Sequence, residues 1–407
     1  MLAWGLARWV FVALVSGCAS QAYLRSPGHN AFTSRNFSEA ETVFSAEAQK
    51  PGVNQLLFML DQGMALFAQK KYEEAVAVLL KAEDLAEIKD FTSISEEVGT
   101  LATGDNVRGY KGEDFEKVLI NVYLALSFAS LGRFESAQVE ARKINLLLYR
   151  MINEGKRNYQ ESPFARYLSA VLWEASGDVN AAYIDYKKTY ELDPGFPEIG
   201  KDLLATSKKM GFDSEYSKWT QVFSTQTPRK FSANEGELVI FFEQGQSPIK
   251  IPRDGQNSSL PRFIPRRSSS QMGKVYVGQM PPQILEYRVL DIEELSTRYL
   301  EDRIGRMVAA KMAGLATKGL IAAGIGNATD NSDLGWLAFY VLALTDQADL
   351  RSWRTLPESL YMIRLPLPAG EYPVRLDVLS RSGLPMASHN FGVVTVKAKK
   401  KVFLIGR

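Results

Sequence analysis

Side chains that could carry catalysis or bind a metal are scarce in this sequence. Its 407 residues include one cysteine, Cys18, and two histidines, His29 and His389. Zinc sites and disulfide frameworks need more of these residues, and most general-base chemistry uses histidine. His389 follows Ser388 in a strand-like stretch, where neighbouring side chains point to opposite faces and cannot form a catalytic pair. The sequence therefore predicts no enzyme, no metal and no cofactor.

Acidic pairs and nucleotide motifs give no better starting point for chemistry. Adjacent carboxylates, such as Glu73 and Glu74, lie in stretches with helical or turn patterns, where they face water or favour a helix start. The sequence contains no glycine-rich phosphate loop, nucleophile elbow or zinc-protease motif. Its 48 basic and 46 acidic residues give a net charge of +2, which excludes nucleic acid as the main partner.

Cys18 is the one residue with a specific chemical prediction. Residues 1–17 combine a positive charge, an apolar core and small residues, as a secretory signal peptide does, and the apolar run is too short to span a bilayer. The sequence Val15-Ser16-Gly17-Cys18 resembles the bacterial lipobox. That resemblance implies cleavage before Cys18 and attachment of lipid, diacylglycerol and a palmitate-like acyl group, to its sulfur and amine. The chemistry requires cysteine because a thiolate is the nucleophile.

The lipobox resemblance also implies a location. Ala19 follows the cysteine, and by similarity to sorting in Gram-negative bacteria the absence of Asp there favours the outer membrane, facing the periplasm. The alternative is an ordinary signal peptide in which Cys18 is incidental. Residues 18–52 are predicted to hold the acylated cysteine, a polar tether and a first helix at about 38–49.

Residues 53–223 contain an internal repeat. Three units, 56–89, 118–151 and 163–196, can be aligned with small residues at their eighth and twentieth positions: Gly63, Ala125 and Ala170, then Ala75, Ala137 and Ala182. These units resemble the tetratricopeptide (TPR) repeat of about 34 residues, in which two short antiparallel helices approach through small residues and neighbouring units share a core. Helices at about 198–210 and 215–223 are predicted to close the array.

The TPR resemblance implies a concave face lined by the first helix of each unit. Its groove positions are apolar and are predicted to bind a partner protein: Leu57, Leu60, Met64, Leu119, Val122, Leu126, Phe164, Tyr167 and Val171. The alternative is burial of the same residues against another part of the chain, because periodicity does not distinguish the two.

After a linker at 224–235, residues 236–407 are predicted to form a β-rich domain. Strand patterns at 237–242, 284–290, 359–365, 372–379, 391–396 and 402–405 indicate a small antiparallel sheet. A helical insertion at about 291–345 is rich in small residues. A helical hairpin that covers the sheet is favoured over a membrane hairpin, because Lys311 and Lys318 interrupt the first arm and the second has 11 apolar residues. The overall fold class is α+β.

The stretch 245–282 is rich in proline and is predicted to be a long loop. It carries a basic cluster, Arg253, Arg262, Arg266, Arg267 and Lys274. These residues could contact lipid phosphates or acidic glycans near a membrane, but a solvated loop is the favoured interpretation.

Residues 349–357 and 365–372, with 236–240 and 247–250, resemble a family of Gram-negative, TPR-bearing lipoproteins. This similarity implies compartment and architecture, and no activity. Within the first stretch, Arg351, Trp353 and Arg354 could form a recognition surface, because arginine and tryptophan are frequent in binding hot spots. A structural role at a domain interface, with arginine stacked on Trp353, is favoured.

Two functional hypotheses follow. The first is a lipid-anchored periplasmic scaffold or adaptor that binds an envelope protein through the TPR-like groove, in cell-envelope biogenesis. The alternative is a membrane- or glycan-binding module that uses the 245–282 segment and the small-residue hairpin. An envelope hydrolase ranks below both.

Overall fold

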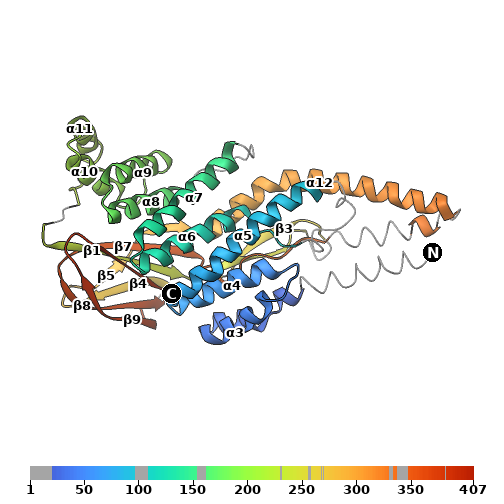
Figure 1. The fold of residues 1–407 in the computed structure, drawn as a ribbon, viewed down its shortest axis with the longest axis horizontal. Coiled ribbons are helices and arrows are strands. Elements are labelled where there is room, and N and C mark those ends of the chain that lie inside the picture. Colours follow the sequence, from blue (N-terminus) through green and yellow to red (C-terminus); the bar gives the residue numbers. More distant parts are fainter. Residues whose placement is uncertain are drawn as a thin grey trace.

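The computed structural model describes residues 21–96, 109–153, 162–229, 232–254, 258–266, 268, 270–329, 333–336, 347–380 and 382–407. The signal stretch, Cys18 and Arg267 lie outside these residues. The protein mixes helices and strands: helices dominate its first half, strands its second, and one long helix extends away from the body (Figure 1).

Ten helices are described between residues 21 and 229. They are α2 (Pro27–Thr33), α3 (Phe37–Ala48), α4 (Gln55–Ala68), α5 (Tyr72–Glu96), α6 (Asp114–Ser130), α7 (Phe134–Asn153), α8 (Pro163–Ser176), α9 (Val179–Leu192), α10 (Ile199–Lys209) and α11 (Asp213–Val222). The pairs α4/α5, α6/α7 and α8/α9 correspond to the three repeat units, and each pair is in extensive contact. Glycine is required at position 63, because a Cβ there would lie 2.5 Å from the side chain of Leu79 on α5.

The helix predicted at about 38–49 corresponds to α3, but the described residues before it do not form the predicted tether. From residue 21 on the chain folds onto α4. Helix α2 begins at Pro27, where proline is well tolerated, and Gly28 lies so close to the ring of Phe44 that a Cβ would come within 2.5 Å of it. The imidazole of His29 lies 2.9 Å from the buried carboxylate of Asp61, so this segment is joined to the repeat core.

The strands form two four-stranded sheets and a hairpin. They are β1 (Glu235–Gln244), β2 (Gln246–Pro252), β3 (Pro261–Arg266), β4 (Ser270–Val277), β5 (Gln283–Leu285), β6 (Arg288–Asp291), β7 (Ser359–Pro368), β8 (Gly370–Ser380), β9 (Pro385–Val396) and β10 (Lys401–Gly406). Sheet A has the order β10-β1-β7-β6, sheet C has the order β5-β4-β8-β9, and β2 pairs with β3.

This topology corrects two predictions. The single antiparallel sheet is instead divided in two, and β10 leaves its neighbour β9 to pair in parallel with β1. The stretch 245–282 is not a long loop, because β2, β3 and β4 lie within it.

The two faces of sheet A serve different cores. Along β1, Leu238, Ile240 and Phe242 pack with residues of sheet C in a sandwich core. Val239 and Phe241 point the other way and belong to the same core as the helical repeats. The alternation of side chains along a strand therefore places sheet A between sheet C and the helices.

Helix α12 (Ile292–Thr329) contacts the body at its beginning and leaves it at its end (Figure 1). Ile292, Tyr299 and Leu300 are buried, and the ring of Tyr299 lies 6.1 Å from that of Phe115 on α6. Its 38 residues, at about 1.5 Å each, make it roughly 57 Å long. The prediction that this insertion covers the sheet is wrong for the described part of α12 beyond the first turns.

Candidate functional site

The predicted groove residues are all part of the protein core. Each is at most 2% exposed: Leu57, Leu60, Met64, Leu119, Val122, Leu126, Phe164, Tyr167 and Val171. Phe164 meets Phe241 of β1 with ring centroids 6.4 Å apart. The prediction that these residues line an open groove for a partner protein is therefore corrected: other parts of the same chain, sheet A among them, form one core with these residues.

Arg364 on β7 is the main polar contact between the sheet and the repeats. Its guanidinium forms two hydrogen bonds of 2.8 Å with the carboxylate of Glu237 on β1. It also donates to Glu174 at 2.7 Å and to Asp202 at 3.1 Å, from α8 and α10. The hydroxyl of Tyr167, a predicted partner-binding residue, donates to the other oxygen of Asp202 at 2.6 Å.

The positive charges of this cluster keep its buried carboxylates ionised. Burial alone would raise the pKa of Glu237, but the positive charges of Arg364 and Lys401 lower it below its ordinary value. Arg364 has 1% of its side chain exposed. A buried ion pair of this kind is costly to break, because the remaining charge is left without a counterion. Arg364 lies 127 residues after Glu237 of the same sheet and 162 residues after Asp202 of α10. Its hydrogen bonds therefore join sheet A to the repeat helices.

The segment that contains Arg351, Trp353 and Arg354 also lies inside the body. Trp353 is 1% exposed, and its backbone N–H donates to Glu116 at 2.7 Å. Arg351 donates to the Asn54 side chain at 3.2 Å, and its guanidinium lies 5.4 Å from the ring of Tyr110. The segment therefore has the structural role that was favoured, although the arginine packs on Tyr110 and not on Trp353.

Arg354 and Thr355 complete these contacts with the helices. Arg354 donates to the carbonyl of Leu24 at 2.7 Å. The hydroxyl of Thr355 accepts from the Trp353 indole at 3.0 Å and donates to Asp61 at 2.7 Å. Thr355 is buried and Arg354 is half-buried, so the two link parts of the chain and do not form an exposed recognition surface.

Glu113, just before α6, holds the base of α12. It forms ion pairs with Lys250 of β2 and Arg303 of α12. Although burial alone would raise the pKa of this carboxyl, Arg303 and Lys250 lower it to about 2. One turn on, burial and the charge of Glu113 raise the pKa of Glu116 to about 7.

The far part of α12 exposes apolar side chains to solvent. Met312 is 65% exposed and Leu320 is 76% exposed. Of the most apolar 18-residue stretch of the helix, 7% is buried in the protein, and the helix is long and apolar enough to cross a membrane. Its end is approached closely by Gly335, where a Cβ would lie 2.9 Å from the carbonyl of Ala322. The chain thus turns back on α12, beside the exposed Trp336.

The predicted basic cluster does not form one surface. Arg253 pairs with Glu301 of α12, and Arg262 is exposed on β3. Lys274 lies on β4, with its ammonium 5.7 Å from the ring of Tyr276. Arg266 donates to the carbonyl oxygens of Ser247 and Arg354, each at 2.6 Å.

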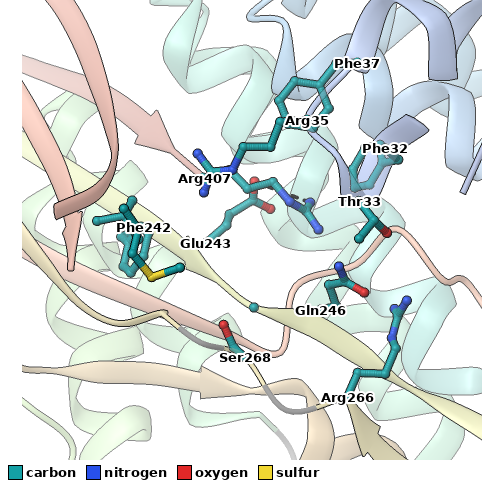
Figure 2. A pocket seen from close by; sticks show the side chains of 13 residues that line it. Phe32, Thr33, Arg35, Phe37, Phe242, Glu243, Gln246, Arg266, Ser268 and Arg407 are labelled. Atoms are coloured by element: carbon teal, nitrogen blue, oxygen red, sulfur yellow. Dashed lines mark ion pairs between the residues drawn. The ribbon is translucent and has the colours of Figure 1, made fainter. Parts of the chain in front are cut away.

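A pocket of about 330 Å³ lies between the α2–α3 corner and the sheets (Figure 2). Its charged side chains are Arg35, Arg266, Arg407 and Glu243, and its apolar ones include Phe32, Phe37, Phe242, Val378 and Met386. Sequence reasoning missed this site, because its arginines are spread over more than 370 residues of sequence, from Arg35 to Arg407.

Arg364 was missed as well, although a signal existed. The strand Ser359–Leu365 was predicted, and Arg364 lies on the same side as Leu360 and Met362, which are buried. A charged residue in the buried half of a strand indicates a buried partner of opposite charge.

Metal ligands do not gather in the described part of the chain: no three His, Cys, Asp or Glu residues there have the geometry to hold an ion. The lipidation prediction for Cys18 falls outside the described residues.

Comparison with known proteins gives similarities of fold only. No family model matches the sequence, and no curated protein is similar to it. A solved structure of MamA from AMB-1 is 14% identical, with a TM-score of 0.33, over 51% of this chain and 93% of that one. A Podosopora anserina putative kinesin light chain with TPR-like repeats is 11% identical, with a TM-score of 0.34, over 50% and 93%. Each of these matches covers about half of this chain.

Proposed function

We propose that this protein is a membrane-anchored, non-enzymatic scaffold of the bacterial cell envelope, and that α12 is its bilayer-contacting element. The observation that carries this proposal is the exposure of α12: an apolar helix of membrane-spanning length projects from a body whose own groove is filled. Exposed apolar surface of this extent is typical of a membrane or protein interface.

The charges of α12 favour a phospholipid bilayer. Between Arg303 and Thr329 the sequence has four basic residues and no acidic one. Arg303 and Arg306 pair with acids near the base of the helix. Lys311 and Lys318 lie seven residues, about two turns, apart along the helix and so share one face. Met312 and Leu320 fall on other faces, and lysines on one face of an apolar helix are compatible with anionic headgroups. Trp336 beside the helix end suits the interface between hydrocarbon and water.

Acylation of Cys18 would supply the second attachment. Lipid chains gain about 0.8 kcal/mol per buried methylene, and stable anchoring takes two signals. The lipobox resemblance and Ala19 favour an anchor in the outer membrane, facing the periplasm. Together the acyl chains and α12 would hold the repeat-and-sandwich body at the membrane surface.

Protein binding remains a second candidate, because α7 presents an exposed apolar row. Val139, Leu146 and Tyr149 are 45%, 49% and 56% exposed, and their spacing of seven and three residues places them on one helix face. An envelope protein would dock on this outer face and not in the concave groove. A photo-crosslinker at position 146 is expected to capture one discrete protein that a crosslinker at the exposed position 191 does not; equal patterns would contradict this candidate.

Vesicle flotation tests the membrane proposal without the acyl anchor. The Cys18→Ser protein, which cannot be acylated, is expected to float with vesicles that contain phosphatidylglycerol. A charge at the centre of a membrane helix costs about 2.5–3.5 kcal/mol, so Met312→Glu or Leu320→Glu, both away from the face of Lys311 and Lys318, is expected to lower partitioning at least tenfold.

Ile184→Glu is the matched control, because Ile184 is 58% exposed but lies on α9 in the repeats. It is expected to float like the parent. Equal flotation of all three variants, or no flotation of the parent, would contradict the proposal.

A further inference from the structure

The pocket of Figure 2 combines three arginines with one carboxylate. Arg35 comes from the α2–α3 corner, Arg266 from the end of β3, and Arg407 follows β10. Glu243 is the acidic lining residue, and its Oε1 accepts a hydrogen bond of 2.6 Å from Tyr123. The formal charge of these four groups is +2, and in this partly open pocket, where Arg35 is exposed, that excess favours binding of an anion.

Arg407 lines this pocket and has one guanidinium nitrogen without a hydrogen bond to the described residues. Its side chain is 11% exposed, and its Nη1 lies 3.7 Å from Glu243, beyond hydrogen-bond distance. That buried nitrogen has no hydrogen-bond partner among the described residues. The guanidinium also lies 4.5 Å from the ring of Phe32, which holds its plane against the pocket wall.

The other two arginines add charge without acidic partners. Within the described part of the chain, neither Arg35 nor Arg266 is in an ion pair with a carboxylate. Arg266 bonds to backbone carbonyls and to the Ser247 hydroxyl, which leaves its positive charge in place. Burial and the neighbouring charges of Arg354 and Arg407 lower the pKa of Arg266 to about 10.

The positive charge also affects the neighbouring side chain of His389. Burial and the charge of Arg35 lower the pKa of His389, on β9, to about 4. The pocket is thus a concentrated positive site in a chain whose overall charge is only +2.

The apolar lining of the pocket indicates what kind of substituent the ligand carries. Phe32, Phe37 and Phe242 are joined by Val378 and Met386, so an apolar surface lies beside the charged one. A volume of about 330 Å³ falls at the small end of ligand pockets. Arginine guanidinium groups match phosphate geometry, and a phosphomonoester carries about −1.5 to −2 charges at pH 7, close to the excess here.

We propose that this arginine pocket binds a small organic phosphate, a phosphomonoester with an apolar or aromatic substituent. The chain end near the pocket lies in the body, well away from the free end of α12 (Figure 1). The ligand is therefore a free molecule and not a headgroup of the bilayer that α12 contacts.

Titration calorimetry with phenyl phosphate tests this assignment on the full-length Cys18→Ser protein. Phenyl phosphate is expected to bind with a submillimolar Kd, at least fivefold tighter than inorganic phosphate or phenylacetate. Arg35→Gln and Arg407→Gln are each expected to weaken it at least tenfold. Arg262→Gln is the matched control, because Arg262 is exposed on the same strand as Arg266 but does not line the pocket, and it is expected to change Kd less than twofold.

Thermal unfolding of each variant separates loss of the site from loss of the fold. Because Arg35 is exposed, Arg35→Gln is expected to keep the parent midpoint. No binding of phenyl phosphate at 10 mM, equal binding of phenylacetate, or binding unchanged by both pocket variants would overturn the proposal. Recruitment to phosphatidic acid vesicles that depends on Arg35 and Arg407 would overturn the assignment to a free ligand.

Discussion

Replacement of Arg364 by methionine tests whether sheet A is held in the concave face by charge. The variant removes the guanidinium and leaves the carboxylates of Glu174, Asp202 and Glu237 buried with less compensation. Breaking one side of a buried ion pair costs about 3–5 kcal/mol. With a urea dependence of about 3 kcal/mol per M, the unfolding midpoint is expected to fall by about 1–1.7 M.

Tryptophan fluorescence is a suitable assay, because Trp353 lies in this interface, 6.0 Å from the ring of Tyr123. Arg375→Met is the matched control: its side chain is 50% exposed and pairs with Asp377, and exposed pairs contribute about 0–1 kcal/mol. If Arg364→Met shifts the midpoint no more than Arg375→Met does, the reasoning about the sheet-filled groove is refuted.

The loss of stability in Arg364→Met is also expected to depend on pH. In the parent protein the folded-state pKa of Glu237 is lowered by Arg364. Stability from a lowered carboxyl pKa is present above the unfolded value, near 4.5, and is lost as the pH falls toward the folded value. The difference between parent and Arg364→Met is therefore expected to shrink below about pH 4.5.

Two further variants test the base of α12 and the buried 349–356 segment. Glu113→Gln removes a carboxyl whose pKa is lowered from 4.5 to about 2 by Arg303 and Lys250. The variant is expected to lose about 3 kcal/mol of unfolding free energy at pH 7, and progressively less between about pH 4.5 and pH 2. Unfolding measured over this pH range checks the prediction, and a pH-independent loss would argue against the ion pairs. Trp353→Ala is expected to cost about 3–5 kcal/mol of unfolding free energy in urea. Trp336 is 72% exposed, so Trp336→Ala is expected to change it by less than about 0.5 kcal/mol. Similar losses for both variants would contradict the burial of Trp353.

The repeat helices were accessible to prediction because their signal is local. Small residues at Gly63 and Ala75 recur at fixed spacing where two helices must approach, and such spacing is visible in the sequence alone. What fills the concave face is not local. Leu60 or Val171 has the same apolar character whether a partner protein or strand β1 covers it.

The strand connections show the same limit. The alternation of apolar residues predicted most strands, but β10 pairs with β1, more than 150 residues away, and not with its neighbour β9. Pairing depends on which sheet faces the helices, and no short stretch of sequence contains that information.

Helix α12 was predicted as a helix but placed wrongly. An apolar helix has the same sequence pattern whether protein or lipid surrounds it. Lys311 and Lys318 argue against a membrane when only their number is considered. Because they share one face, they are compatible with a helix whose remaining faces enter a bilayer. The pocket arginines lay beyond prediction, because Arg35, Arg266 and Arg407 meet only through the fold.

The depth of α12 in a bilayer tests the central claim most directly. Cys18→Ser makes the protein free of cysteine, so Met312→Cys and Leu320→Cys can each carry a single environment-sensitive fluorophore, with Ile184→Cys as the reference site. On phosphatidylglycerol vesicles the fluorophore at 312 and at 320 is expected to shift to the blue and resist an aqueous quencher, while the one at 184 does neither. Spectra at 312 and 320 that stay those of the protein in water would contradict the account.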